Sequence, residues 1–100
     1  MFAQQGALKL SSDQGPVQNI QISNVDIISS TFSGIHLAGR NAIDTVSFTG
    51  VNVTNPGGCG LLAQTMGAAN ATNVVVTGAG AGLCNGSGFT FIRGPGDVGW

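Results

Sequence analysis

The chain has 100 residues, which suffices for one small domain and is too short for two. Only 7% of its residues are charged, 17 are glycines and none is tyrosine, which argues against disorder and long helices and favours short strands joined by tight turns. The formal net charge is −1 with three basic residues, and no apolar run approaches the roughly 20 residues of a membrane span, so neither nucleic acid nor a membrane is an expected partner.

A repeat of about 27 residues predicts the elements in chain order. The first strand of each repeat is expected at 7–10, 34–37, 60–63 and 88–91. The second strand is expected at 20–22, 46–48 and 74–76, and the third at 25–27, 51–53 and a weaker 79–81. In each, apolar positions alternate with outward residues, as in a half-buried strand.

One residue separates the second and third strands of each repeat. It is Asn24, Gly50 and Gly78 in turn, and these residue types best tolerate positive φ. A sharp bend at this point, with three strands per coil, predicts an all-β fold, a right-handed parallel β-helix of about three and a half coils.

Three ladders of stacked side chains follow from this register. Two are expected inside the coil. One consists of Leu8, Ile35, Leu61 and Phe89, and the other consists of Ile22, Phe48 and Val76. The third is polar and precedes the second strand, and it consists of Asn19, Thr45 and Asn73.

Loop lengths predict where a ligand would bind. The loop before each first strand has six residues in every repeat, at 28–33, 54–59 and 82–87. The loop after each first strand varies in length and places Asp13, Arg40 and Gln64 on one edge. Because insertions in solenoids often line the binding face, these three residues and the nearby His36 are the candidates for substrate contact.

The acidic residues do not predict a catalytic site in this chain. Glycoside cleavage normally needs two carboxyl groups about 5 to 10 Å apart. The four aspartates, Asp13, Asp26, Asp44 and Asp97, fall in different columns of the repeat, so we expect surface positions and no catalytic residue. We likewise expect His36 to be an outward, solvated side chain, and no metal site or cofactor.

Two features concern the later part of the chain. Cys59 ends one six-residue loop and Cys84 lies within the equivalent loop of the next coil, so a disulfide is favoured over free thiols. Residues 93–100 are interpreted as a cap, with Trp100 covering the last coil, within a single domain that spans 1–100.

Several short segments carry a family resemblance. They are 6–8, 24–27, 33–35 and above all Gly88-Phe89-Thr90 leading to Gly99-Trp100. Together they resemble the C-terminal end of the mycodextranase and α-1,3-glucanase (mutanase) family of glycoside hydrolases. The resemblance implies a secreted, pectate-lyase-like β-helix that hydrolyses α-1,3-glucan with paired aspartates on earlier coils, and this chain has no adjacent aspartate pair.

Two functions from different classes are therefore expected. The first is the C-terminal scaffold segment of a secreted α-glucan hydrolase, with its catalytic aspartates upstream. The alternative is a non-catalytic β-solenoid for carbohydrate binding or adhesion, while an ice-binding solenoid ranks last because outward threonine rows are not evident. The expected partners are polysaccharide and upstream coils of the same parent chain, or other copies through edge-to-edge association of the isolated chain.

Overall fold

The computed structural model describes residues 6–28, 32–86 and 88–100. These residues form nine strands and contain no helix that is long and apolar enough to cross a membrane. The strands are β1 (Gly6–Ser11), β2 (Ile20–Ile28), β3 (Ser33–Ala38), β4 (Ile43–Thr54), β5 (Cys59–Gln64), β6 (Gly67–Thr72), β7 (Val75–Thr77), β8 (Ala81–Asn85) and β9 (Phe89–Arg93).

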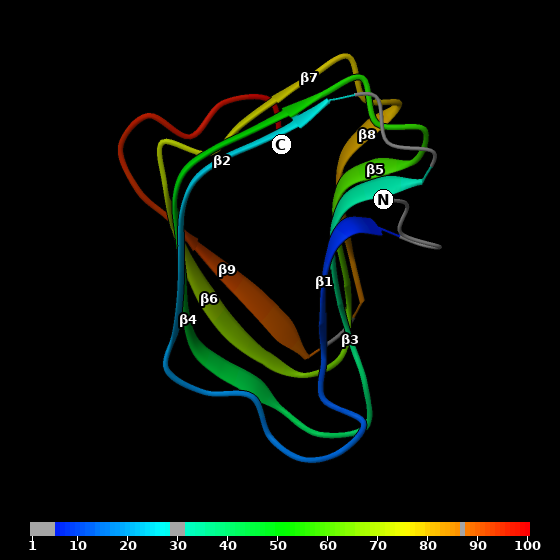
Figure 1. Ribbon diagram of the computed structural model, residues 1–100, viewed down its shortest axis with the longest axis vertical. Coiled ribbons are helices and arrows are strands. Elements are labelled where there is room, and N and C mark those ends of the chain that lie inside the picture. The colour runs from blue at the N-terminus through cyan, green and yellow to red at the C-terminus, as the bar shows by residue number, and fades with distance from the viewer. Residues whose placement is uncertain (1–5, 29–31, 87) are drawn as a thin grey trace.

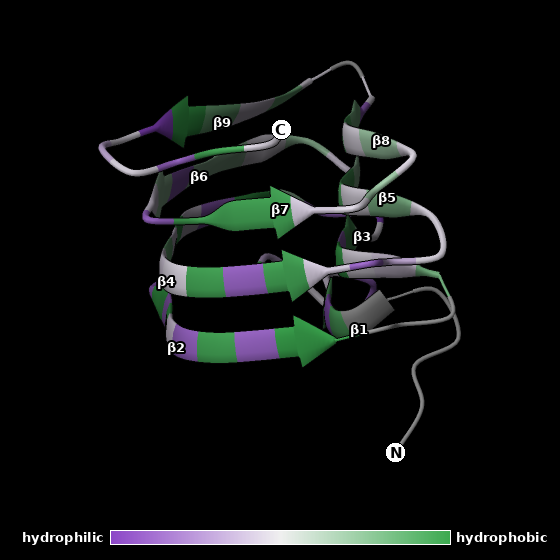
Figure 2. Cartoon of the chain, turned by 90° about the horizontal axis from the view of Figure 1, so that it is seen from above, coloured by the Kyte–Doolittle hydropathy of each residue, from purple (hydrophilic) through white to green (hydrophobic). Residues whose placement is uncertain are grey.

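All strand pairings are parallel, and the chain forms a β-solenoid of about three turns (Figure 1). One sheet has the order β1-β3-β5-β8, and the other has the order β2-β4-β6-β9, with β7 also paired to β4. Figure 2 shows β2, β4 and β7 stacked beside the first sheet, so successive coils lie on top of one another. The predicted all-β solenoid is confirmed.

The bend between the second and third predicted strands is a kink inside a single long strand. Asn24 bends β2 with φ 56°, and Gly50 bends β4 with φ 66°. In the next two coils this position is taken by Asn73 with φ 54° and Gly96 with φ 80°. The prediction of Gly78 here was wrong, because Gly78 instead stacks on Asn55 at the following corner.

The third coil is shorter than the 28-residue spacing predicted for it. Leu61 pairs with Leu83 of β8, and Ala69 of β6 pairs with Phe91 of β9, each 22 residues later. The strand at 88–91 therefore belongs to the second column, not the first, and β8 occupies much of the loop expected at 82–87. Residues 29–31 and 87 of the predicted loops lie outside the described residues.

The same shortening corrects the predicted ladders. Val75 and Val76 pair with Asn52 and Val53, so they form the third strand, and no strand begins at 79. The observed ladders are Leu8, Ile35, Leu61 and Leu83 in the first column, and Ile22, Phe48, Ala71 and Arg93 in the second. Asn19 and Thr45 share positive φ before the second predicted strand. Asn73 instead belongs to the column of residues at the bend, Asn24, Gly50, Asn73 and Gly96, which is called the bend column below.

The core runs along the axis of the coil. Ile35, Leu61 and Phe48 are buried, while Leu8 and Ile22 at the same ladder positions in the first coil are only partly buried. Among the described residues, β1 and β2 pair on one side only, which explains this difference. Within the described part of the chain, the first coil thus leaves apolar side chains and backbone groups at an unpaired edge.

Candidate functional site

Three successive turns at the variable edge are tied together by hydrogen bonds. The backbone carbonyl of Asn41, after β3, accepts from Ser12 Oγ at 2.6 Å and from Thr65 Oγ1 at 2.7 Å. The Asn41 side chain returns a hydrogen bond from Nδ2 to the Ser12 carbonyl at 2.6 Å. Because Ser12 is fully buried, this network fixes the turns after β1, β3 and β5 relative to one another.

The turns after β3 and β5 border an open groove with a volume of about 630 Å³. Its apolar part includes Leu62 of β5, Ala63 and Met66, and its polar part includes Arg40 and Gln64. The remaining lining residues come from the turns after β3 and β5 and from the end of β8, and they are Gly39, Thr65, Cys84, Asn85 and Gly86. The groove therefore lies at the carboxyl ends of β3, β5 and β8.

His36 does not have the solvated position predicted for it. It stands between Lys9 and Leu62 in the outward ladder of the first sheet, yet it is only 1% exposed. Its Nε2 lies 2.7 Å from Oε1 of Gln64, and its Nδ1 has no hydrogen-bond partner among the described residues. Because an amide oxygen only accepts, Nε2 donates this bond and the imidazole holds the Gln64 side chain.

The four aspartates lie in the turn after β1, in β2, in β4 and after β9, and the register pairs Asp26 with Asn52 rather than with another acid. Asp97 accepts from the backbone N–H groups of Val74 and Gly94, at 2.9 Å and 2.8 Å, so its carboxylate organises the last coil. Asp26 accepts from Asn52 on the outward face of β2 and β4, and Asp13 is exposed in the turn after β1. Within the described ranges, no three histidine, cysteine or acidic side chains are placed to hold a metal.

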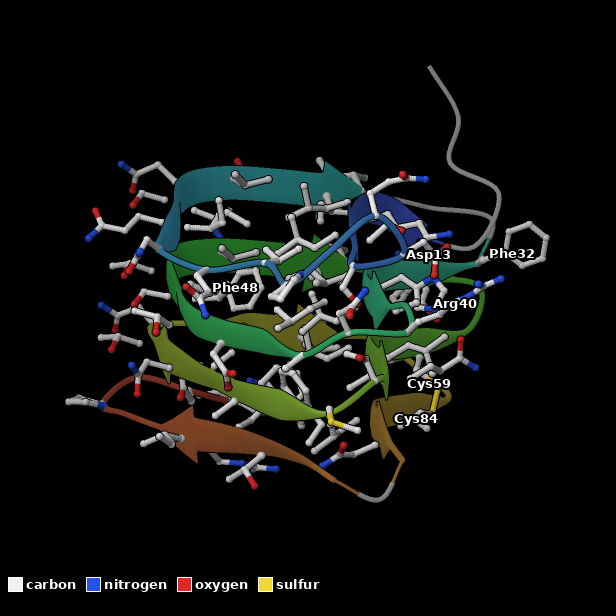
Figure 3. The ribbon with its side chains drawn as sticks, turned by 90° about the horizontal axis from the view of Figure 1, so that it is seen from below. Asp13, Phe32, Arg40, Phe48, Cys59 and Cys84 are labelled. Carbon is white, nitrogen blue, oxygen red and sulfur yellow. A yellow bond between two sulfur atoms is a disulfide. The ribbon has the colours of Figure 1, made fainter. Side chains whose placement is uncertain are left out.

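Cys59 and Cys84 are joined by a disulfide whose Cα atoms lie 5.9 Å apart. Cys84 lies in β8 rather than in the loop expected from the sequence, and it pairs with Leu62 while Cys59 pairs with Ala81. Figure 3 shows the disulfide on the same side of the solenoid as Arg40 and Asp13, while Phe48 points into the interior. The disulfide therefore links β5 to β8 beside the groove.

The segment after β9 returns to the third coil. Val98 forms a parallel bridge with Val75, and Trp100 Nε1 donates to the Val74 carbonyl at 3.0 Å. The Trp100 ring packs edge-on against Phe91 and carries the Arg93 guanidinium 4.3 Å from its centroid. These contacts place Trp100 against the core of the last described coil.

The structure brings together only some of the predicted contact residues. Arg40 and Gln64 line the groove and His36 holds Gln64, whereas Asp13 is not among the lining residues. Sequence reasoning missed Ser12, Asn41, Thr65 and Asn85, which are single polar residues without a motif. Their roles depend on the turns of different coils meeting in space.

Comparison with known proteins adds one result to this geometry. No protein family profile matches the chain, and no curated protein matches it. Among solved structures, the chain is similar to the catalytic unit of a thermostable GH87 α-1,3-glucanase from Streptomyces thermodiastaticus strain HF3-3. The TM-score is 0.87, with 32% sequence identity over 95% of this chain and 20% of that chain.

This likeness gives the chain a GH87-like fold and relates it to a glycoside hydrolase scaffold. The chain spans about a fifth of the length of the Streptomyces protein. The similar region is therefore only one part of a larger catalytic unit.

Proposed function

We propose that the chain is the C-terminal scaffold segment of a secreted glycoside hydrolase acting on α-1,3-glucan-type polysaccharide. The observation that carries the proposal is the 0.87 TM-score and 32% identity to a GH87 α-1,3-glucanase catalytic unit over nearly the whole chain. The mycodextranase relation and the place at the end of the enzyme rest on the sequence resemblance described above, above all that of Gly88-Phe89-Thr90 leading to Gly99-Trp100. Residues 93–100 would cap the solenoid through Trp100.

The catalytic aspartates are proposed to lie in other coils. Here Asp97 is engaged with backbone N–H groups and Asp26 with Asn52, and among the described residues neither is paired with a second carboxylate. Glycoside cleavage needs two cooperating carboxyl groups, so this segment would supply the scaffold and one wall of the substrate cleft. Upstream coils of the parent chain would continue the sheets at β1 and β2.

A chimaera tests this proposal directly. The 100 residues would replace the corresponding fifth of the Streptomyces glucanase, and sugar release from α-1,3-glucan would be measured beside the isolated chain. We expect release by the chimaera and none by the isolated chain. Hydrolysis by the isolated chain that is abolished by Asp26→Asn or Asp44→Asn would contradict the scaffold role.

The groove favours a second candidate, a non-catalytic carbohydrate-binding or adhesion module. It presents Arg40 and Gln64 beside apolar side chains without any lining carboxylate. A folded but inactive chimaera, together with glucan binding by the isolated chain, would favour this alternative.

A further inference from the structure

We propose that the groove at the ends of β3, β5 and β8 is a binding subsite for a neutral glucan chain, in which His36 holds the Gln64 amide as an oriented donor. This inference rests on the glucan substrate proposed above. It adds where the glucan contacts this chain, which atoms make the contact, and a positioning residue that the ligand does not touch.

The internal hydrogen bonds determine which donors remain for a ligand. Gln64 uses Oε1 to accept from His36, which leaves its two Nε2 hydrogens available on an exposed side chain. Arg40 is also exposed and lines the same groove. The groove therefore offers donors from two neighbouring turns, one after β3 and one after β5.

Acceptors also remain among the residues that line the same groove. Asn85 Nδ2 donates to the Phe89 carbonyl at 2.8 Å, which leaves Asn85 Oδ1 free to accept. Thr65 donates its hydroxyl hydrogen to Asn41 at 2.7 Å, so its oxygen lone pairs can accept from a ligand.

A sugar hydroxyl both donates and accepts, whereas a carboxylate or phosphate only accepts. The mixture of Gln64, Asn85 and Thr65 therefore suits a neutral saccharide, since an anion would leave the acceptors unmatched. Leu62 and the 58% exposed Met66 supply apolar surface for the C–H face of a sugar ring. Apolar surface with a few convergent polar groups is typical of small-ligand sites.

His36 acts through Gln64 rather than by touching the ligand. The ring is buried, and its 2.7 Å bond fixes one end of a side chain that would otherwise rotate freely. Holding a ligand-binding side chain in place before binding reduces the entropy lost on association. Removing the imidazole should therefore weaken binding while leaving the Gln64 amide present.

The test measures the affinity of the disulfide-intact chain for an α-1,3-linked glucose tetramer by NMR titration. Gln64→Glu keeps the acceptor for His36 but removes the free donor, and His36→Leu places in the ladder the residue type found at its neighbour Leu62. We expect each variant to weaken binding about 2- to 10-fold, the effect of one hydrogen bond. Gln21→Ala, an exposed glutamine on β2, is the matched control and should bind like the unchanged chain.

A double-mutant cycle separates positioning from a general effect on folding. In the His36→Leu background, Gln64→Ala should cause little further loss, because both changes remove the same oriented donor. Fully additive losses would overturn the positioning role of His36. Tighter binding of polygalacturonate than of the glucose tetramer would overturn the assignment to a neutral ligand.

The outcomes also distinguish this inference from the proposed function. Suppose that the chimaera hydrolyses glucan but the groove variants all bind the tetramer with unchanged affinity, or the isolated chain does not bind it at all. Either result would overturn the subsite and leave the scaffold role standing. Conversely, the isolated chain could bind the tetramer through Gln64 while the folded chimaera is inactive. That result would support the subsite and contradict the scaffold role.

Discussion

At Gly60 the backbone of one coil approaches the next too closely for a side chain. A Cβ added there would clash with Val76 and lie 2.8 Å from the carbonyl oxygen of Gly82. Gly34 is in the same situation against Val53 and Gly60. The recurring glycine of the first strand is thus a packing requirement between coils rather than a turn requirement.

We therefore expect Gly60→Ala to lower the free energy of unfolding by about 1–3 kcal/mol, the usual cost of overpacking a core. Gly80→Ala is the matched control, since a Cβ there meets nothing within 4 Å. Replacing that exposed glycine should be neutral or stabilise by about 0.4–1 kcal/mol through the unfolded state. Denaturant unfolding of both variants is the measurement, and equal effects would contradict the packing argument.

At the scale of the elements, alternation of asparagine and glycine shapes the bend column. Asn24 Oδ1 lies 3.0 Å from the position that a Cβ on Gly50 would take, and Asn73 stacks on Gly96 in the same way. Each asparagine amide fills the space that the following glycine leaves open. The bend is therefore built from pairs of adjacent coils and not from single residues.

The disulfide joins two elements that carry the groove. It links β5 to β8 across a sequence separation of 25 residues, and closing a loop of this size is worth about 3.5 kcal/mol in the chain-entropy account. We expect the Cys59→Ser, Cys84→Ser double variant to lose about this amount in denaturant unfolding. Reductant should lower the stability of the unchanged chain and leave the double variant unaffected; the same loss in both would refute the assignment.

For the whole molecule, the first coil determines how the isolated chain behaves. β1 and β2 each lack a partner on one side among the described residues, and Leu8, Leu10, Ile20 and Ile22 beside them are only partly buried. Unpaired strand edges with apolar neighbours pair with other chains. The same edge would accept a preceding coil in a longer protein.

We accordingly expect concentration-dependent association in sedimentation velocity. Ile22→Lys would place a charge at this edge and should shift the chain toward monomer, whereas Thr49→Lys, at an exposed position on β4, which is paired on both sides, should not. A strictly monomeric, cooperatively melting chain across the concentration range would rule out edge pairing.

The repeat by itself determined the solenoid, the first two coils and the variable edge that carries Arg40 and Gln64. This was possible because inward apolar residues alternate with outward ones on each side of the bend in β2 and β4, and because Asn24 and Gly50 mark the bend. Neighbouring coils of similar length repeat these signals in sequence.

Only the tertiary structure determined the register of the third coil, the burial of His36 and its hydrogen bond to Gln64. β6 is built from small residues, with Ala69 and Ala71 buried where the preceding coil holds Val46 and Phe48. Its sequence therefore does not indicate a strand, whereas the valines at 74–76 do. Burial of His36 and its bond to Gln64 arise from side chains 28 residues apart meeting on adjacent coils. Periodicity shows which residues share a column, but packing between columns determines which are exposed.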